Sequence, residues 1–497
     1  MNPPNPAYRA ALDIARRLRD AGHQAFFAGG CVRDLMLGFA PKDFDVATSA
    51  TPDQIVALFP KTFTVGAHFG VVLVCDQIDD TSITTEVATF RSDGAYSDGR
   101  RPDAVRYTAD PREDVLRRDF TINGLLLDPL AYDGTGDPAS ATLDFVHGRE
   151  DLATHVIRAI GDPALRFAED KLRMLRAVRF AARLGFQIDP ATSAAIRRHA
   201  AEIAQVSAER IRDELTRILT EGGARRGFEL LFDLGLLAQV LPEVARLRGV
   251  AQPPQFHPEG DVWTHTMLML KMVGVAHTEG VPHPFADSSR KSGIQALAET
   301  SPPSNPVSPT LAWGALLHDI GKPATYQPAN PAIPGSRIRF HGHVEAGVRI
   351  AESILARLRF SNDDSAQVLA LVRHHMRFGD VLQMKQSTLK RFLRLPRFDE
   401  HLALHRLDAL SAHGDLACYN FSRAQFETEP APDLRPAPLL TGSHLITAGY
   451  SPSPQFKPML TLAEDAQLEG AITTREQALA LVRAAYPLPS PNPAPRK

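Results

Sequence analysis

Hydrophobic and polar positions divide the chain into a first part with short apolar runs and a longer second part with helical periodicity. In the first part, residues 10–21 repeat apolar side chains at helical spacing, and Thr51-Pro52 opens a second helix-like stretch. Runs rich in Val, Ile, Thr and Phe, bounded by turn residues, predict strands at 24–30, 43–48, 62–75 and 82–90. The pattern predicts an α/β region that ends near residue 145.

From about residue 150 onward the pattern becomes helical. Apolar side chains recur with arginines between them at Phe167, Leu172, Leu175, Val178, Phe180 and Ala181. Further helices are predicted at 211–219 and 228–241. Residues 149–226 contain 15 Lys and Arg against 11 Asp and Glu, so this segment is locally basic although the whole chain has a net charge of −2.

Composition shifts suggest the domain organisation. The Pro- and Ser-rich stretch 278–309 predicts a flexible insertion, and 486–497 predicts a disordered tail. We expect an α+β protein: a head with a small mixed sheet, an all-α neck and a second all-α domain. The expected boundaries are 1–147 for the head, 148–250 for the neck, 251–430 for the second helical domain and 431–497 for a C-terminal helical segment with its tail.

Bulk composition narrows the class of protein further. A chain of 497 residues with 44% hydrophobic and 23% charged residues is ordinary for a multidomain globular protein. Three widely separated cysteines give neither a disulfide framework nor a zinc-ribbon spacing. The N-terminus carries no apolar targeting segment, and no apolar run reaches membrane-spanning length. We therefore expect a cytoplasmic protein without a membrane partner, and the sequence gives no indication of its oligomeric state.

The first candidate site follows the first predicted strand. Gly29 and Gly30 allow backbone N–H groups to approach a phosphate, and Arg33 adds a forked cation. Asp43 and Asp45 are two residues apart, so in a strand both side chains leave the same face. Two adjacent carboxylates repel each other unless a divalent cation lies between them, and Mg²⁺ suits hard oxygen ligands. Glu86, on a later strand-like run, is a candidate third carboxylate of a two-metal site.

These motifs resemble a known enzyme family. The run GGCVRDLMLGFAPKDFDVATSATP is similar to the signature of the class II branch of polymerase-β-like nucleotidyltransferases. That branch contains bacterial CCA-adding enzymes and poly(A) polymerases. The resemblance continues, in family order, through TFRSDGAYSDGRRPDAV, RRDFTINGLLLDP and RFAEDKLRMLRAVRFAARLGF. One departure is Gly124, where the family usually has Ala, and we expect little effect from it because both residues are small.

The resemblance implies roles for individual residues. Asp43 and Asp45 would hold Mg²⁺ and help activate the primer hydroxyl, with Glu86 beside them. Gly30 and Arg33 would contact the triphosphate of ATP or CTP. The remaining nucleotide-binding residues that it implies are Arg118, Asp119, Asn123, Asp170, Arg173, Arg176 and Arg179.

Asp170 and Arg173 are the candidates for reading the base. They are predicted to be positions i and i+3 of one helix, so their side chains share a face. A carboxylate accepts from a base amino group, and a guanidinium donates to a ring nitrogen or carbonyl. Cytosine and adenine each offer an amino donor beside a ring acceptor, so a protein edge of this kind could select them without a template.

A second candidate site lies in the later helices. Leu316-Leu317-His318-Asp319-Ile320-Gly321 places adjacent imidazole and carboxylate ligands at a helical stretch ended by Gly and Pro. This series resembles the HD phosphohydrolase superfamily. The resemblance implies His265, His318, Asp319 and Asp408 as metal ligands, with His343 and His375 serving a second metal or the substrate phosphate. Such a ligand set accepts Mn, Fe, Ni, Co or Zn and implies hydrolysis of a phosphoester.

The combined prediction is an enzyme that adds C and A, from CTP and ATP, to the 3′ end of tRNA, with contacts to the tRNA elbow from the neck and C-terminal helices. An HD-domain phosphohydrolase activity on RNA 3′ ends or nucleotides is a second predicted activity. The alternatives are a bacterial poly(A) polymerase and an enzyme that adds only CC or only A. From other classes, the alternatives are an HD phosphohydrolase whose head only docks RNA, and a non-catalytic RNA-binding protein. The stretch Asp93–Arg101 resembles the family's flexible loop and favours an enzyme that uses CTP.

Overall fold

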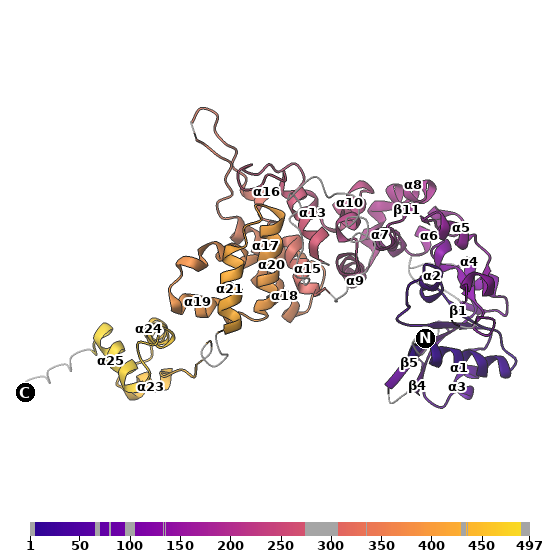
Figure 1. The fold of residues 1–497 in the computed structure, drawn as a ribbon, viewed down its shortest axis with the longest axis horizontal. Coiled ribbons are helices and arrows are strands. Elements are labelled where there is room, and N and C mark those ends of the chain that lie inside the picture. Colours follow the sequence, from indigo (N-terminus) through magenta and orange to yellow (C-terminus); the bar gives the residue numbers. More distant parts are fainter. Residues whose placement is uncertain are drawn as a thin grey trace, which may run out of the picture. The chain divides into compact units, whose positions relative to one another are not determined.

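The computed structural model describes residues 5–64, 70–78, 81–94, 105–132, 134, 136–273, 307–333, 335–428, 434 and 436–488. These residues form two compact units, one dominated by Met1–Arg246 and one by the residues from Leu247 onward (Figure 1). The predicted flexible insertion (278–309) lies outside the described residues up to residue 306, as do the predicted loop from residue 95 and the tail from residue 489. Within the described ranges, no helix combines the length and apolarity needed to cross a membrane.

A seven-stranded mixed sheet forms the centre of the first unit, in the order β3-β4-β5-β2-β1-β8-β9. Its strands are β1 (Ala25–Ala28), β2 (Asp45–Thr48), β3 (Thr62–Phe63), β4 (Val71–Ile78), β5 (Thr81–Thr89), β8 (Leu125–Leu127) and β9 (Thr142–Asp144). Strands β2 and β5 pair in parallel, while the other neighbours in the sheet pair antiparallel. A separate hairpin is formed by β6 (Arg91–Asp93) and β7 (Val105–Tyr107). A strand lies in each predicted run, but the run at 62–75 contains two, β3 and β4, and the run at 43–48 becomes a strand only from Asp45.

Helices cover this sheet. Helix α1 (Pro6–Asp20) begins at Asn5, whose side chain accepts a hydrogen bond from the Ala7 N–H, and it packs across β1, β2, β4 and β5 (Figure 1). Its apolar stripe is fully buried, so it stabilises the sheet through the hydrophobic effect. The other elements around the sheet are α2 (Gly30–Met36), α3 (Pro52–Leu58), α4 (Pro111–Leu116), η2 (Thr121–Asn123) and η3 (Pro138–Ala141).

The rest of the first unit is mainly helical. Its elements are α5 (Gly148–Ala153), β10 (Val156–Ile157), α6 (Pro163–Glu169), α7 (Leu172–Leu184), β11 (Gln187–Ile188), α8 (Pro190–His199), η4 (Ala200–Gln205), α9 (Ala208–Thr220), α10 (Ala224–Asp233), α11 (Leu237–Val240) and α12 (Pro242–Ala245). Helix α7 is the centre of this region, because it packs against both α9 and α10.

Gly124 is packed more tightly than its small size suggested. A Cβ atom at this position would lie 2.7 Å from Val146 Cγ2, 3.1 Å from Val115 Cγ1 and 3.2 Å from Ile160 Cδ1. These branched side chains are short and stiff, so they cannot move aside cheaply. Our expectation that alanine would have little effect here is therefore wrong.

Gly124→Ala is expected to destabilise the first unit by about 1–3 kcal/mol, which is typical of overpacking in a close-packed core. Differential scanning calorimetry should record a lower transition for this unit. Both tryptophans, Trp263 and Trp313, are buried in the second unit, so their fluorescence transition should stay unchanged. Gly379→Ala is the matched control, because a Cβ there would meet nothing within 4 Å. Equal stability of Gly124→Ala and wild type would contradict this packing argument.

In its described residues, the regular structure of the second unit is helical apart from one isolated β-bridge between Gln327 and Arg339. Its elements are α13 (Val262–Val273), α15 (Pro309–Leu317), α16 (Lys322–Thr325), α17 (His343–Arg357), α18 (Asn362–His374), η5 (His375–Gln383), α19 (Gln386–Leu393), α20 (Phe398–Ser411), α21 (Ala417–Thr428), α23 (Gly442–Thr447), α24 (Phe456–Leu468) and α25 (Arg475–Ala485). Helices α13, α15, α18 and α20 pack on one another. The mixed sheet followed by helices confirms the predicted α+β class.

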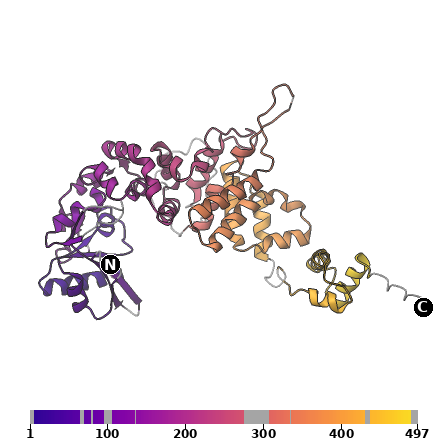
Figure 2. The same ribbon diagram turned by 180° about the vertical axis from the view of Figure 1, so that it is seen from behind.

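The last helices have a core of their own. Leu445, Tyr450, Met459 and Val482 belong to one buried cluster that joins α23, α24 and α25, the yellow group at the C-terminal end in Figure 2. Arg391 on α19 and Arg394, which caps the C-terminus of that helix, pair with Glu464 on α24 and so connect this group to the preceding helices.

Candidate active sites

The sheet brings the first set of candidate residues together. Asp45 is the first residue of β2 and pairs with Ala28, the last residue of β1. On the other side of β2, Val46 pairs with Val87 of β5, so the parallel register sets Asp45 beside Glu86. Asp43 precedes β2 rather than lying within it, which corrects our expectation of two carboxylates on one strand. Its charge nevertheless acts on Asp45.

The electrostatics of this cluster favour a cation. Burial, together with the neighbouring Glu86 and Asp43 carboxylates, raises the pKa of Asp45 to about 7 against the opposing effect of Arg118. Asp43 and Glu86 are exposed, so the cluster is open to solvent on one side. Three carboxylates that repel one another around the start of β2 are the kind of oxygen ligand set that fits a divalent cation.

A glycine turn borders the carboxylates. Gly29 has φ +74°, a backbone conformation that L side chains rarely adopt, and it precedes α2 directly. A Cβ on Gly29 would lie 3.3 Å from Arg118 Nη1, so the guanidinium rests against the bare backbone. This turn therefore places backbone N–H groups and the Arg118 cation at the end of β1, next to Asp45.

A buried hydrogen-bonded chain links four of the predicted nucleotide-binding residues. Arg33 Nη1 donates to Asn123 Oδ1 at 2.8 Å, and Asn123 Nδ2 donates to Asp119 Oδ1 at 3.1 Å. Arg176 Nη2 then donates to Asp119 Oδ2 at 2.6 Å. Burial alone would raise the pKa of Asp119, but Arg176 and Asn123 hold that pKa at about 2. Asp119 thus stays ionised and fixes two guanidinium-bearing elements, α2 and α7, in one arrangement.

Phe180 on α7 is the packing centre of this chain. Its ring is almost fully buried and lies within 5.1 Å of the Arg33 guanidinium, 5.3 Å of that of Arg176 and 4.3 Å of that of Arg179. Three cations around one ring form cation–π contacts while keeping their positive charge. Arg179 is also tied to Glu214 at 2.5 Å. Arg179 therefore supports the pocket from within the helices.

Asp170 and Arg173 do not share one helix face as we expected. Helix α6 ends at Glu169, Asp170 adopts an extended conformation with φ −145°, and α7 begins at Leu172. The Asp170 carboxylate accepts from the Leu172 N–H at 3.1 Å and from Arg210 Nη2 at 2.7 Å. This short-range hydrogen bond to the backbone competes with helix formation and explains the break.

Arg173 has separate partners. It donates to Glu169 Oε2 at 2.6 Å and to the Arg117 carbonyl at 3.0 Å. The sequence analysis missed Arg210, because it lies 40 residues after Asp170 on α9 and no local spacing connects the two. Asp170 and Arg173 thus lie at the same helix start but engage different neighbours.

The second candidate site gathers all six predicted HD residues. His318 and Asp319 lie in the turn between α15 and α16, His265 on α13 and Asp408 on α20. His265 Nε2 lies 3.1 Å from Asp408 Oδ1, and His318 Nε2 lies 3.1 Å from Asp319 Oδ2. Ligand atoms of His265, His318 and Asp319 all lie within 4.8 Å of one another, and so do those of Asp319, His343 and His375.

The imidazoles are oriented for metal binding. The Nδ1 atoms of His318, His343 and His375 each hydrogen-bond a backbone carbonyl, at 3.0, 3.0 and 2.7 Å. Their Nε2 atoms, like that of His265, are buried and form no hydrogen bond. Buried ring nitrogens that face two carboxylates fit one or two divalent cations well.

Asp319 is central to this cluster. Its Oδ1 lies 3.7 Å from His375 Nε2 and 3.8 Å from His343 Nε2, while its Oδ2 lies 2.6 Å from Lys322 Nζ. Burial alone would raise the pKa of Asp319, but the adjacent Lys322 and His318 hold that pKa well below its ordinary value. Lys322 was not singled out from the sequence, although it follows Asp319 by three residues, one helical turn.

Glu259 positions His265. The carboxylate is fully buried and its Oε1 lies 2.7 Å from His265 Nδ1 and 2.8 Å from His257 Nδ1. A carboxylate on the far nitrogen fixes the tautomer and the ring orientation of a metal-binding histidine. The sequence analysis quoted the run that contains Glu259 but gave it no role.

Glu259→Gln is expected to weaken divalent-metal binding at the HD site about 10–100-fold, because the neutral amide no longer polarises His265. Competition with a chromogenic chelator measures this affinity directly. Glu345→Gln, an exposed carboxylate in the first turn of α17, is the matched control. Unchanged metal affinity in Glu259→Gln would remove this positioning role.

His401 makes the second unit sensitive to acid. The ring is buried on α20, and burial together with the neighbouring His374 lowers the pKa of His401 to about 4. Because this pKa is below the unfolded value near 6.5, the neutral ring favours folding above pH 6.5, and the benefit is lost as the pH falls toward 4.

At pH 5 this effect should cost roughly 2 kcal/mol of unfolding free energy relative to pH 7.5. His401→Gln does not titrate, so its urea unfolding curve, followed by tryptophan fluorescence, should lose less stability over this range than the wild type. Parallel pH profiles for the two proteins would refute the assignment to His401.

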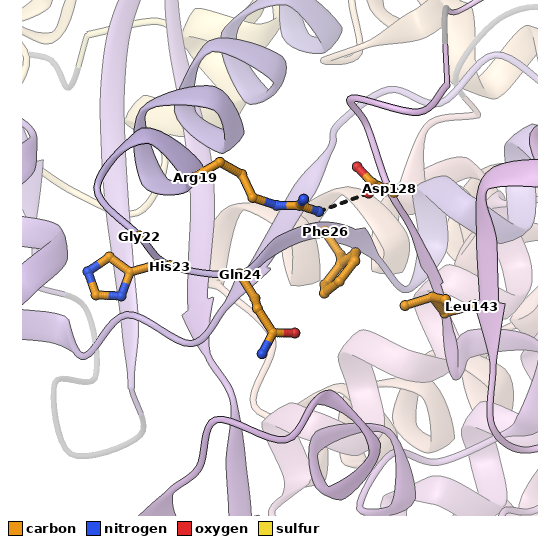
Figure 3. A pocket seen from close by; sticks show the side chains of 7 residues that line it. All are labelled: Arg19, Gly22, His23, Gln24, Phe26, Asp128 and Leu143. Carbon is orange, nitrogen blue, oxygen red and sulfur yellow. Dashed lines mark ion pairs between the residues drawn. The ribbon is translucent and has the colours of Figure 1, made fainter.

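A cavity of about 470 Å³ in the first unit is not part of either site (Figure 3). It lies at the start of β1, whereas Gly29 and Asp45 lie at the end of that strand. Arg19, its only cation besides His23, pairs with Asp128 at 3.0 Å. With its guanidinium already engaged and no carboxylate cluster, this cavity offers no metal or phosphate site.

Three protein families match successive parts of the chain. Residues 25–158 match the family described as the poly(A) polymerase head domain, residues 185–247 match a probable RNA- and SrmB-binding site of polymerase A, and residues 294–412 match the HD domain. These parts of the chain therefore belong to the poly(A) polymerase head, the polymerase A RNA-binding and the HD domain families. The family resemblance seen in the sequence is thereby confirmed.

Curated relatives support this family assignment. The CCA-adding enzyme of Limosilactobacillus fermentum is 42% identical over 229 residues, which are 46% of this chain and 54% of that protein. The CCA-adding enzyme of Lactobacillus johnsonii is 38% identical over 280 residues, 56% of this chain and 66% of that protein. The chain thus spans about half to two thirds of the length of the curated relatives it matches.

Solved structures of this family share the fold. The Bacillus stearothermophilus CCA-adding enzyme in complex with CTP aligns over 97% of this chain and 98% of its own, with a TM-score of 0.67 and 24% identity. The Thermotoga maritima CCA-adding enzyme complexed with tRNA aligns over 96% of this chain and 95% of its own, with a TM-score of 0.53 and 16% identity. At these identities the likeness concerns the fold.

Proposed function

We propose that this chain adds nucleotides to the 3′ end of tRNA, using CTP and ATP, without a nucleic-acid template. The observation that carries the proposal is the cluster of Asp43, Asp45 and Glu86 beside the Gly29 turn and Arg118. The names of the curated relatives, all CCA-adding enzymes, and the RNA-binding family match support tRNA as the acceptor.

The residues of the head have distinct roles in this reaction. Asp43 and Asp45 would hold Mg²⁺, which supplies charge neutralisation for the triphosphate and activation of the primer hydroxyl. The Gly30 backbone, Arg33 and Arg118 bind the triphosphate. The chain from Arg33 through Asn123 and Asp119 to Arg176 holds these groups rigid, so little reorganisation accompanies the reaction. Glu86 is the third carboxylate of the same site.

Base selection falls to Asp170 and Arg173. A carboxylate beside a guanidinium complements the amino donor and ring acceptor of cytosine and adenine. Asp170 already accepts from Arg210, and Arg173 already donates to Glu169. An incoming base would replace these hydrogen bonds or form additional ones. The proposed regions are the head at 1–147 and the neck at 148–250.

The incorporation test distinguishes the rival transferases. The purified chain is incubated with tRNA transcripts that end before CCA, before CA or before A, and with radiolabelled CTP or ATP. The proposal predicts two C additions and one A addition, in that order. Long A tracts would identify a poly(A) polymerase, and C addition alone or A addition alone would identify an enzyme with part of the activity. No incorporation with any transcript would overturn the proposal.

A second activity is proposed for residues 251–430. The HD ligand set, with four buried imidazole nitrogens facing two carboxylates, fits hydrolysis of a phosphoester. His265, His318, Asp319 and Asp408 would hold a divalent transition metal, which supplies Lewis-acid activation of water. His343 and His375 face the same carboxylate and would bind a second metal or the substrate phosphate. RNA 3′ ends and nucleotides are the proposed substrates.

A further inference from the structure

Beside the HD cluster lies a set of aromatic and cationic side chains that metal binding does not use. Phe256, Tyr326, Arg337 and Phe340 make up this aromatic–arginine rim. Phe256 is 48% exposed and Tyr326 is 40% exposed, so both rings are accessible to a ligand. Arg337 is exposed as well, and in the described part of the chain no carboxylate pairs with it.

Two direct contacts organise the rim. The Arg337 guanidinium lies 5.7 Å from the Phe256 ring centroid, and the Tyr326 and Phe340 rings lie 5.9 Å apart. Tyr326, Arg337 and Phe340 belong to one arm, whose two sides are joined by hydrogen bonds in both directions between Gln327 and Arg339, at 2.9 and 3.0 Å. The pairs are therefore held by a backbone bridge and by side-chain contacts.

Both parts of the rim, the arm that carries Phe340 and the segment that carries Phe256, are linked by contacts to the metal ligands. The Phe340 carbonyl accepts from His343 Nδ1 at 3.0 Å, and the Phe340 ring lies 5.4 Å from Lys322 Nζ. Lys322 in turn lies 2.6 Å from Asp319 Oδ2 and donates to Gln252 Oε1 at 2.7 Å, which brings in the segment that carries Phe256. A molecule whose phosphate lies at the HD cluster would have these rings and cations as its next neighbours.

We propose that the aromatic–arginine rim binds the base and an adjoining phosphate of a nucleotide, and so selects nucleoside phosphoesters as substrates of the HD site. Exposed aromatic rings stack on any base, and a guanidinium without a carboxylate partner binds phosphate oxygen. The inference rests on the phosphohydrolase function proposed above. An apolar protein ligand would leave the cation of the rim unused, and a small alkyl phosphate would leave its aromatic rings unused. A nucleotide can use both.

The reaction balances without a further reagent. A water oxygen forms a bond to phosphorus, one P–O ester bond breaks, and the released sugar hydroxyl takes up the proton that the water loses. With a nucleoside 2′,3′-cyclic phosphate, the product is a nucleoside monophosphate, which keeps the base of the substrate. The rim can therefore hold substrate and product by the same group.

The test compares a substrate with a base to one without. The metal-loaded full chain is given cytidine 2′,3′-cyclic phosphate or glycerol 1,2-cyclic phosphate, which has the same ester ring and no base. Tyr326→Ala and Phe256→Ala are each expected to raise KM for the cytidine ester about tenfold, with a matching fall in its preference over the glycerol ester. Tyr326→Phe should retain the preference. Ile333→Ala, an exposed apolar residue of the same arm outside the rim, is the control and should change neither substrate.

The proposed role of the rim would be refuted if both alanine variants kept the preference for the cytidine ester. Equal KM values for the two esters in the wild type would refute it as well. Calorimetric titration with cytidine monophosphate separates this failure from failure of the phosphohydrolase proposal. Suppose that no ester is hydrolysed, but that the nucleotide binds and the alanine variants lose this binding. Base binding by the rim is then supported, and the phosphohydrolase proposal is refuted. If the nucleotide does not bind, the proposed base binding by the rim is refuted.

The two sources of nucleoside phosphate are distinguished by a short RNA that ends in a 2′,3′-cyclic phosphate. Tighter binding of the RNA than of cytidine 2′,3′-cyclic phosphate, with a salt dependence that Arg337→Ala reduces, identifies an RNA end as the ligand. Equal binding of the two identifies a free nucleotide.

Discussion

The Asp45→Asn variant is expected to transfer nucleotides to RNA at least about 100-fold more slowly than the wild type, and its metal-free head is expected to be more stable. Both effects have one cause. The charges of Asp43 and Glu86 act on Asp45, so the Asp45 charge is needed for cation binding and is unfavourable without the cation. The amide keeps the shape of the side chain and removes the repulsion.

The sign of the stability effect follows from the raised pKa. Burial and the neighbouring carboxylates raise the pKa of Asp45 to about 7. The folded state therefore holds a proton that the unfolded state has released, and stability falls as the pH rises from about 4 to 7. Asp45→Asn should not show this fall. Added Mg²⁺ should stabilise the wild type above pH 7 and leave the variant unchanged.

Calorimetric melting of the head at pH 5 and pH 8, with and without Mg²⁺, measures this behaviour, and the radiolabelled incorporation assay measures the rate. Asp20→Asn, an exposed carboxylate at the end of α1, is the matched control and should behave as wild type. Wild-type transfer rates in Asp45→Asn, or an equal response of both proteins to Mg²⁺, would refute the role given to this residue.

Loss of the HD ligands should separate the two proposed activities. His318→Ala and Asp319→Asn are expected to lower phosphoester hydrolysis at least about 100-fold, since removal of a ligand exceeds the effect of removing its supporting hydrogen bond. Nucleotide addition should stay within about twofold of wild type, because it depends on carboxylates of the other unit. His341→Ala is the control, because His341 is exposed and outside the ligand set.

Parallel assays on one preparation decide this prediction: release of phosphate or opening of a cyclic phosphate for the HD site, and incorporation of labelled CTP for the head. Hydrolysis that persists in both HD variants would place that activity elsewhere in the chain. A joint loss of both activities in properly folded protein would show that the two sites depend on each other.

Local chemistry was predictable where the participating residues are close in sequence or share a strand register. Asp43 and Asp45 are neighbours in the chain, and β-rich runs are easily recognised, so their pairing with Glu86 could be anticipated. The six HD residues could be assigned because their order along the chain matches that of a known superfamily. The physical signal in both cases is a residue type that has little reason to be buried or clustered without a cation.

Partners from distant segments could not be predicted. Arg210 reaches Asp170 only because α9 packs on α7, and no spacing in the sequence encodes that contact. The break at Asp170 was missed because apolar periodicity continues across it. A side-chain hydrogen bond to the backbone, rather than a change in hydrophobic pattern, interrupts the helix there.

Packing tightness was equally invisible in the sequence. Gly124 and alanine look interchangeable by size, but three branched side chains converge on the position from different elements. Glu259 is a similar case. Its role depends on a buried contact with His265, and an acidic residue near a histidine is usually a solvated neighbour instead.

The most direct test of the central claim is an anomalous difference map from crystals grown with Mn²⁺ and a nonhydrolysable CTP analogue. The account predicts anomalous density bridging Asp43 and Asp45 and touching the triphosphate beside Gly30. Divergent carboxylates with no cation density between them, in crystals that hold the nucleotide, would contradict it.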